Sequence, residues 1–317
     1  IKEVLSMTNI LHKKDDGTIH ATGTLEKRSP GDQVVQVLIY ALIALIAVLC
    51  LLPFIYVIAG SFATERELTE RPFFLIPREF SINAYSYIFK DGSVFRGLRN
   101  SILVTVVGTL INMFVSCTIA YPLSRPYLKG RNGFINMVIV TMLFSGGMVP
   151  SYIMVMNVLH LGNTYWALWL PIAMNAFNMI IIKNYFQSLP MELEEAAIID
   201  GSNDLLTFIR IILPLSTPVL ASVGLFYAVS HWNSYFNAMM YINNTEMEVM
   251  PIVLRRMVFL TNQIAQDSTF DWGAFGQPPA KSVKMAVTVV STIPMLCVYP
   301  FVQKYFTQGL MVGSVKG

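Results

Sequence analysis

Long runs without charged residues constrain this chain more than any other feature of its sequence. No Asp, Glu, Lys or Arg occurs between Arg131 and Lys183. A helix needs about 20 apolar residues to cross a bilayer, and a charge at its centre costs roughly 2.5–3.5 kcal/mol. This run is too long for one helix, and the segment His-Leu-Gly-Asn-Thr at 160–164 interrupts it. We therefore predict a helical hairpin with spans at 134–159 and 165–182.

The same criterion predicts four further spans. Only 13% of the 317 residues are charged and 54% are hydrophobic, whereas soluble domains are about 25% charged. The first span begins late and lacks a small-x-small cleavage site, so we do not expect a cleaved signal peptide. The predicted fold is an all-α polytopic membrane protein whose transmembrane domain extends over 34–306. Its six transmembrane helices comprise the hairpin and spans at 34–58, 102–123, 217–242 and 285–303.

An even number of spans places both termini on one side of the membrane. The loop 125–131 carries three basic residues and no acid, which is typical of a cytoplasmic loop. On that assignment, 1–33 and 307–317 are cytoplasmic tails. The loop 60–100 would then lie outside although it carries six basic residues. Charge alone therefore leaves the orientation open.

The segment 184–214 interrupts the apolar pattern with five acidic residues, so it cannot cross the membrane. Its residues predict two short helices. Ser188 can cap the first helix, and Gly201 can end it because glycine tolerates a left-handed exit conformation. Either Ser202 or Asn203 can cap the second helix.

One face of the first short helix carries Leu193, Ala196, Ala197 and Asp200. These residues follow the i, i+3, i+4, i+7 spacing of one helix face. Two alanines leave a shallow surface that another protein can approach closely. A solvated acidic helix without a partner fits the same pattern, and the pattern alone leaves both interpretations open.

The order of residues in this segment resembles the EAA loop of permease subunits of ATP-binding-cassette importers. The matching residues are Glu195, Ala196, Ala197, Asp200, Gly201, Leu213 and Pro214. In that family the loop faces the cytoplasm and docks into a cleft of the ATPase subunit. The resemblance therefore implies that this loop couples the chain to an ATPase, that both termini are cytoplasmic, and that the fold is that of a type I importer permease.

The resemblance extends over nearly the whole chain. The Gly146-Gly147 segment, the His231-Trp232-Asn233 run and the closing residues resemble maltose-type carbohydrate permeases, most closely the subgroup that imports oligosaccharides or polysaccharide fragments. It implies a multi-pass protein of a bacterial cell membrane that forms a translocation path for a carbohydrate. The implied partners are a second, related permease in a heterodimer, two ATPase subunits, an extracytoplasmic solute-binding protein and the lipid bilayer.

Two further contacts are implied by the family. Its C-terminal tail contacts the ATPase pair, which here assigns that contact to Val315, Lys316 and Gly317. Its loop before the last span reaches the binding protein. The candidates for that contact are the large apolar residues Phe270, Trp272 and Phe275. A plain external connection is the alternative for this loop.

The sequence lacks the residue patterns of several chemistries. It contains no G-x-x-x-x-G-K-[ST] loop, so we expect ATP and Mg²⁺ to bind the partner ATPase subunits and no cofactor to bind this chain. Cys50, Cys117 and Cys297 lie in apolar runs without metal-ligand spacing, so neither a metal nor a catalytic residue is predicted. A net charge of +3 is too small to indicate nucleic acid.

Two rival functions are weighed against the importer. An ion-gradient-driven secondary transporter is expected to carry ionisable residues within its spans, and the predicted spans contain no Asp, Glu, Lys or Arg. An intramembrane enzyme would need a nucleophile, a metal cluster or a pair of buried carboxylates, and none of these stands out.

Polar and aromatic residues within the spans are candidates for the substrate path. Polar groups in a bilayer are expensive, and sugars bind through hydrogen bonds and stacking on aromatic rings. Hydrogen bonding between helices is the alternative role for the polar residues, and Trp232 also suits the membrane interface. Asn112 and Asn237 are further polar residues within spans. The candidates are Asn175, Asn178, Tyr227, His231, Trp232, Asn233 and Tyr235.

Overall fold

The computed structural model divides into two compact units, residues 1–55 and 56–317. Helices dominate the described residues, and no strand occurs among them beyond an isolated bridge. The all-α prediction is therefore confirmed. The described residues are 30–90, 92–144, 146–266 and 280–314.

Helix α1 (Pro30–Ser61) begins in the first unit. It starts at Pro30, four residues before the predicted span, because proline suits the first turn of a helix. Residues 1–29 of the predicted tail lie outside the described residues. The most apolar stretch of α1 is long and hydrophobic enough to cross a membrane.

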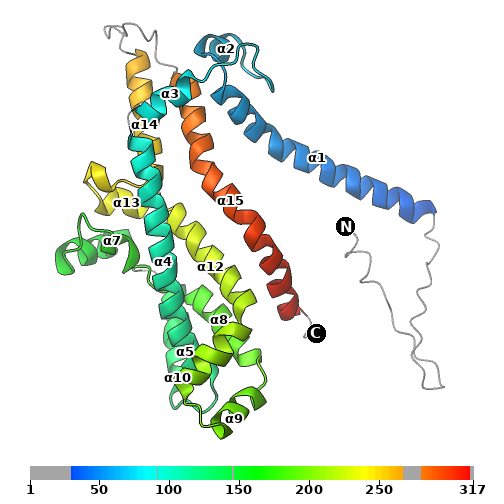
Figure 1. Ribbon diagram of the computed structural model, residues 1–317, viewed down its shortest axis with the longest axis vertical. Helices are drawn as coiled ribbons and strands as arrows, with labels where there is room; N and C mark the ends of the chain where they lie inside the picture. Colours follow the sequence, from blue (N-terminus) through cyan, green and yellow to red (C-terminus); the bar gives the residue numbers. More distant parts are fainter. Residues whose placement is uncertain (1–29, 91, 145, 267–279, 315–317) are drawn as a thin grey trace. The chain divides into compact units, whose positions relative to one another are not determined.

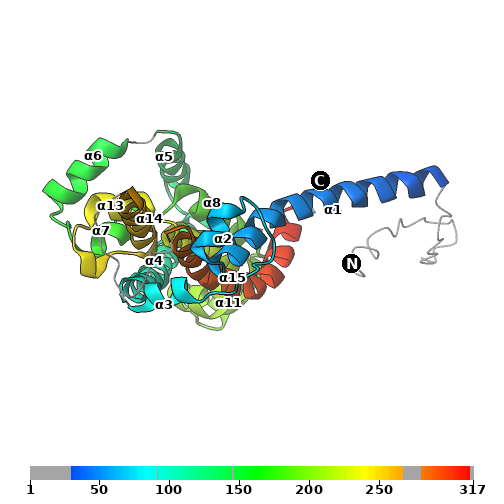
Figure 2. The same cartoon turned by 90° about the horizontal axis from the view of Figure 1, so that it is seen from above.

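Helix α4 (Ser93–Ser124) organises the second unit. It packs against α8 (Ala176–Ser188), α12 (Thr217–Trp232) and α14 (Met250–Gln266). Helix α15 (Ala280–Ser314) packs against α12 and α14 (Figure 1). Seen from above, α4 lies beside α14 (Figure 2). The predicted spans 102–123 and 285–303 fall inside α4 and α15, both of which are longer than predicted.

Three of the predicted spans are broken in the structure. In the range 134–159, α5 (Arg131–Leu143) gives way to α6 (Met148–Ile153) and a π-helical turn. Gly147 lies between them with a φ of +83°, which ends helical geometry. The 217–242 range contains α12, Asn233 and Ser234, and then α13 (Tyr235–Tyr241). The prediction of continuous helices is therefore wrong in these ranges.

The third break divides 165–182. It separates α7 (Trp166–Trp169) from α8 by a non-helical connection at 170–175. Pro171 lies in this connection and has no N–H to continue α7. Within the described residues, three helices are long and apolar enough to cross a membrane, or up to five if each bent pair counts as one span. The six-span topology therefore stays a prediction.

Helices also occur where the sequence predicted loops. The 60–100 segment contains α2 (Glu65–Glu70) and α3 (Asn83–Lys90), and the 243–284 segment contains α14. Helix α14 was missed because Arg255 and Arg256 exclude it from any search for charge-free runs. Its start is held on α4, where Ser101 Oγ accepts the Met250 N–H at 2.7 Å.

The close approach of α4 and α12 requires a glycine. A Cβ atom at Gly108 would lie 2.5 Å from both Cε1 and Nε2 of His231. His231 is 3% exposed, and its Nε2 lies 2.6 Å from Asn112 Oδ1. The ring therefore cannot turn away without losing this hydrogen bond.

We predict that Gly108→Ala lowers the free energy of unfolding by about 1–3 kcal/mol, because overpacking shifts α4 away from α12. Denaturant titration of the purified chain in detergent measures the change. The matched control is Gly133→Ala in α5, where no atom lies within 4 Å of an added Cβ. The control is expected to leave stability unchanged or raise it by up to about 1 kcal/mol. Equal effects of both substitutions would contradict the close packing at Gly108.

Candidate functional site

The segment 184–214 is called the coupling segment, after the role that the resemblance implies. It forms a helix-turn-helix at one end of the second unit, opposite α2, α3 and α14 (Figure 1). Its first helix is α9 (Glu192–Ile199). The second part runs through α10 (Asp204–Thr207), a π-helical turn (Phe208–Ile212) and α11 (Leu213–Leu215). Pro214 has no N–H for the normal helical bond, which is consistent with the wider π turn before it.

The caps of these helices follow from individual residues. Gly201 has a φ of +81°, and its N–H donates to the Ile198 carbonyl while the Ser202 N–H donates to the Ala197 carbonyl. This is a Schellman motif, so the predicted stop at Gly201 is confirmed. Asn203 Oδ1 accepts the Leu206 N–H at 2.8 Å and therefore caps the second helix.

The predicted cap at Ser188 is wrong. Ser188 is the last residue of α8, and its hydroxyl donates to the Tyr185 carbonyl at 2.8 Å. Helix α9 begins four residues later, at Glu192, with Met191 as its N-cap and no side-chain cap. Helix α8 extends further along the chain than the apolar pattern predicts, and Ser188 is therefore its last residue.

The face predicted for α9 is divided in the structure. Ala197 is buried, and Glu194 is buried with it one turn earlier. Leu193, Ala196 and Asp200 remain exposed. The prediction of one face shared by all four residues is therefore corrected: Ala197 packs inward and does not line the outer surface.

The outer surface of this segment carries large apolar side chains. Ile199 is 85% exposed, and Ile198, Leu205 and Ile209 are also more than half exposed. Glu195 is exposed on the same helix as Ile199. Clustered apolar side chains at an exposed tip indicate a surface that binds another protein.

A buried ion pair fixes α9 to the end of α4. The Arg125 guanidinium pairs with the Glu194 carboxylate, and the two side chains are 3% and 7% exposed. Arg125 also lies over the Tyr121 ring, 4.9 Å from its centroid. Burial raises the pKa of the Glu194 carboxyl, and the Arg125 charge acts in the opposite direction. The sequence pattern does not predict this pair, because Arg125 stands out there only as one of the basic residues of the loop 125–131. The available signal for a buried contact is that Glu194 lies three residues before the small Ala197, on the same side of the helix.

A second feature of this unit is a cleft of about 480 Å³ beside the break between α7 and α8. Asn175, Asn178, Tyr227 and His231 line it, as does Asn112 of α4. Four of the seven predicted path residues are therefore brought together. The remaining three do not line the cleft: Trp232 is buried, Asn233 ends α12, and Tyr235 lies under Arg255 of α14.

The polar residues of the cleft hold the broken backbone. The Asn112 amide donates to the Ile172 carbonyl, and the Asn175 N–H donates to the Tyr227 hydroxyl at 3.1 Å. Tyr227 also lies 2.7 Å from the Ser116 hydroxyl. Non-helical backbone at membrane depth is tolerated where protein groups satisfy it or where it borders a cavity. Both conditions are met here, so these residues do bond between helices, and their role in a substrate path stays a prediction.

Two groups of predicted contacts lie outside the described residues. They are the binding-protein candidates Phe270, Trp272 and Phe275 and the tail residues Val315, Lys316 and Gly317. Their roles stay predictions. Within the described residues, no group of three or more His, Cys, Asp or Glu side chains could hold a metal ion.

Residues 17–312 match the family described as the binding-protein-dependent transport system inner membrane component. The chain belongs to this family. It is therefore a multi-pass protein of a bacterial cell membrane and a component of a transporter, and the ion-gradient alternative is set aside.

Individual relatives align with this permease over most of their length. It is 48% identical over 286 residues to the polygalacturonan/rhamnogalacturonan transport system permease protein YtcP of Bacillus subtilis, covering 90% of this chain and 99% of YtcP. It is 31% identical to the trehalose/maltose transport system permease protein MalG of Thermococcus litoralis, covering 86% of this chain and 94% of MalG. These alignments confirm the resemblance to carbohydrate permeases.

A solved structure shares the fold of this permease. It is the crystal structure of a bacterial ABC transporter involved in the import of the acidic polysaccharide alginate. The matched chain has a TM-score of 0.79 and 30% sequence identity, and the match covers 88% of this permease and 99% of that chain. The importer permease fold is therefore confirmed.

We predict that Arg125→Ala and Glu194→Ala each lower the free energy of unfolding by about 3–5 kcal/mol, because each leaves a buried charge without its partner. The double substitution Arg125→Met with Glu194→Leu is expected to recover most of this loss. Denaturant titration in detergent measures all three.

The control pair for this prediction is Arg66 and Glu70, whose nitrogen and oxygen lie 2.7 Å apart with side chains 81% and 60% exposed. Replacing either control residue with Ala is expected to cost at most about 1 kcal/mol. Single substitutions at Arg125 and Glu194 that cost no more than the control would show that the pair does not anchor α9.

Proposed function

We propose that this chain is the membrane-spanning permease subunit of an ATP-driven importer for a carbohydrate, such as an oligosaccharide or a polysaccharide fragment. It forms the path with a second permease and receives its substrate from an extracytoplasmic binding protein. Two separate ATPase subunits bind ATP and Mg²⁺ and dock on the α9 segment. The carbohydrate substrates of the two relatives above support this class of substrate.

The observation that carries the proposal is that one helix joins the coupling segment to the cleft. Arg125 at the end of α4 holds α9, and Asn112 of the same helix lines the cleft. The two residues are 13 positions apart in the sequence, which corresponds to about 20 Å along a helix. A displacement of α9 therefore reaches the cleft through a continuous helix.

In this mechanism the chain moves its helices and makes or breaks no covalent bond. ATP-driven closure of the ATPase pair moves α9, and the buried ion pair passes the movement to α4. Asn112 bonds both to the α7–α8 connection and to His231 of α12. Movement of α4 therefore rearranges three walls of the cleft together, which opens the path alternately to the two sides of the membrane.

The cleft suits a sugar better than an ion. Asparagine amides offer both donors and acceptors to hydroxyl groups, and Phe177, Phe226 and Tyr227 supply aromatic surfaces. Its lining residues include no Asp, Glu, Lys or Arg. A transporter driven by an ion gradient is expected to place such groups along its path.

We predict that the purified chain in liposomes neither hydrolyses ATP nor takes up sugar, because it has no phosphate-binding loop. Liposomes that also contain the second permease, the ATPase subunits and the binding protein are expected to take up oligosaccharide only with ATP. Radiolabelled uptake and phosphate release measure both activities. Turnover of ATP by the chain alone, or uptake by the full assembly driven by an ion gradient without ATP, would overturn the proposal.

A further inference from the structure

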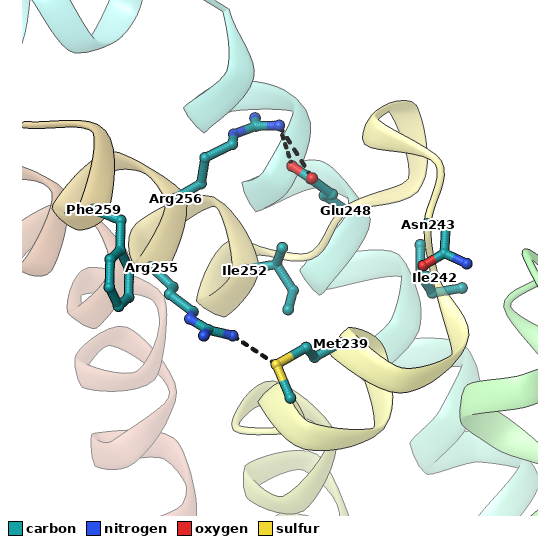
Figure 3. Close-up of a pocket in the computed structure, with 8 residues that line it drawn as sticks. All are labelled: Met239, Ile242, Asn243, Glu248, Ile252, Arg255, Arg256 and Phe259. Atoms are coloured by element: carbon teal, nitrogen blue, oxygen red, sulfur yellow. Dashed lines mark hydrogen bonds and ion pairs between the residues drawn. The ribbon is translucent and has the colours of Figure 1, made fainter. Parts of the chain in front are cut away.

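A second cleft, of about 420 Å³, lies between α13 and α14. Its volume falls in the range of small-molecule sites, roughly 300–1,000 Å³. The walls are mixed: Met239, Ile252 and Phe259 are apolar, whereas Arg255 and Arg256 are charged (Figure 3). It belongs to the end of the unit that carries α14, opposite the coupling segment (Figure 1).

The two arginines of this cleft have different partners. Arg256 pairs with the Glu248 carboxylate, with nitrogen–oxygen distances of 2.8 and 3.1 Å. Arg255 points the other way, toward the Met239 sulfur (Figure 3). A thioether is a weak acceptor. Among the residues that the structure describes, Arg255 has no carboxylate within ion-pair distance.

The carboxylates of the two acidic residues nearest in sequence to Arg255 already form ion pairs with other arginines. Glu246 pairs with Arg96 of α4 at 3.2 Å, and Glu248 pairs with Arg256. Asn100 of α4 fixes their backbone by donating to the carbonyls of both glutamates, at 2.8 and 2.9 Å. The segment is therefore held in place, and the positive charge of Arg255 stays uncompensated within the described residues.

Two aromatic rings orient Arg255. Its guanidinium carbon lies 5.5 Å from the centroid of the Tyr235 ring and 5.2 Å from that of Phe259. Rings on a guanidinium hold its planar fork without consuming its in-plane N–H donors. Such a fork matches the two oxygens of a carboxylate. Phe259 is 55% exposed and offers a surface on which a sugar ring can stack.

We propose that Arg255, with Tyr235 and Phe259, forms a subsite for the carboxylate of a uronate residue, so that the imported carbohydrate is an acidic oligosaccharide. This inference rests on the proposed function, and it narrows the substrate from a carbohydrate to one with carboxylated sugar units. The subsite lies apart from the α7–α8 cleft and receives the sugar before that cleft does.

The test uses liposomes containing the complete transporter and its binding protein, with trigalacturonate and neutral galactotriose as probes. Wild type is expected to take up trigalacturonate, and Arg255→Gln is expected to lower that uptake about tenfold, as the loss of a charge-assisted hydrogen bond implies. Arg255→Lys keeps the charge but not the fork, so its uptake is expected to lie between the two. It also gives the result if Arg255→Gln fails to assemble. The matched control, Arg66→Gln on α2, removes an equal charge and is expected to behave as wild type.

Several results would overturn the inference. Uptake of trigalacturonate that is unaffected in Arg255→Gln and Arg255→Lys would do so, as would a fall that is no larger than in Arg66→Gln. If Arg255→Gln weakens the docking of sugar-free binding protein to the same extent, Arg255 serves that protein and not the sugar. If its effect is present in liposomes that contain anionic phosphatidylglycerol and disappears in liposomes of zwitterionic phosphatidylcholine alone, Arg255 binds the headgroup of an anionic lipid and not the sugar.

Failure of this inference is distinguishable from failure of the proposed function. ATP-dependent uptake of galactotriose without trigalacturonate would overturn the acidic subsite and leave the carbohydrate importer standing. ATP-dependent uptake of neither these nor any other oligosaccharide would overturn both.

Discussion

The structure depends on how unpaired backbone groups are satisfied inside a membrane protein. The connection between α7 and α8 is not helical, so its N–H and C=O groups need partners that lipid cannot supply. Asn112 of α4 and Tyr227 of α12 supply them, at the Ile172 carbonyl and the Asn175 N–H. The break draws these polar side chains to one place, and the cleft lies against it. A continuous helix in this range would need neither the polar residues nor the cleft.

The buried pair of Arg125 and Glu194 solves a different problem at the end of α4. An exposed helix with an apolar tip can dock on a partner, but it transmits force only if its base is fixed. A surface ion pair contributes little to stability, whereas breaking a buried one is costly because it strands a charge. The pair therefore makes α9 an extension of α4, the helix whose Asn112 shapes the cleft. Gly108 supports the same connection by letting α4 approach His231 of α12 closely.

Part of the local chemistry was predictable from the sequence, and long-range pairing was not. The stop at Gly201 and a cap at Ser202 or Asn203 follow from properties of single residues, and the structure contains the stop and the Asn203 cap. The cap predicted at Ser188 is wrong because α8 extends through that residue. Charge-free runs located the apolar segments but not their breaks, because an uncharged Gly or Pro does not alter a count of charges. The search for charge-free runs also excludes α14, because this helix contains Arg255 and Arg256. A helix at the end of the unit tolerates both charges. The contacts of Arg125 with Glu194 and of Arg255 with Tyr235 join residues far apart in the chain, and no local pattern specifies them.

The central claim is that α9 and α4 move as one body when ATP drives the transporter. Pulsed electron paramagnetic resonance tests it with one spin label at Glu192, an exposed position at the start of α9, and another at Leu110, an exposed position of α4. The complete transporter is measured without nucleotide and with ATP trapped in the ATPase subunits. The account predicts the same narrow distance distribution in both states, and a broad one when Arg125 is replaced by Ala. A wild-type distance that changes between the two states would contradict it.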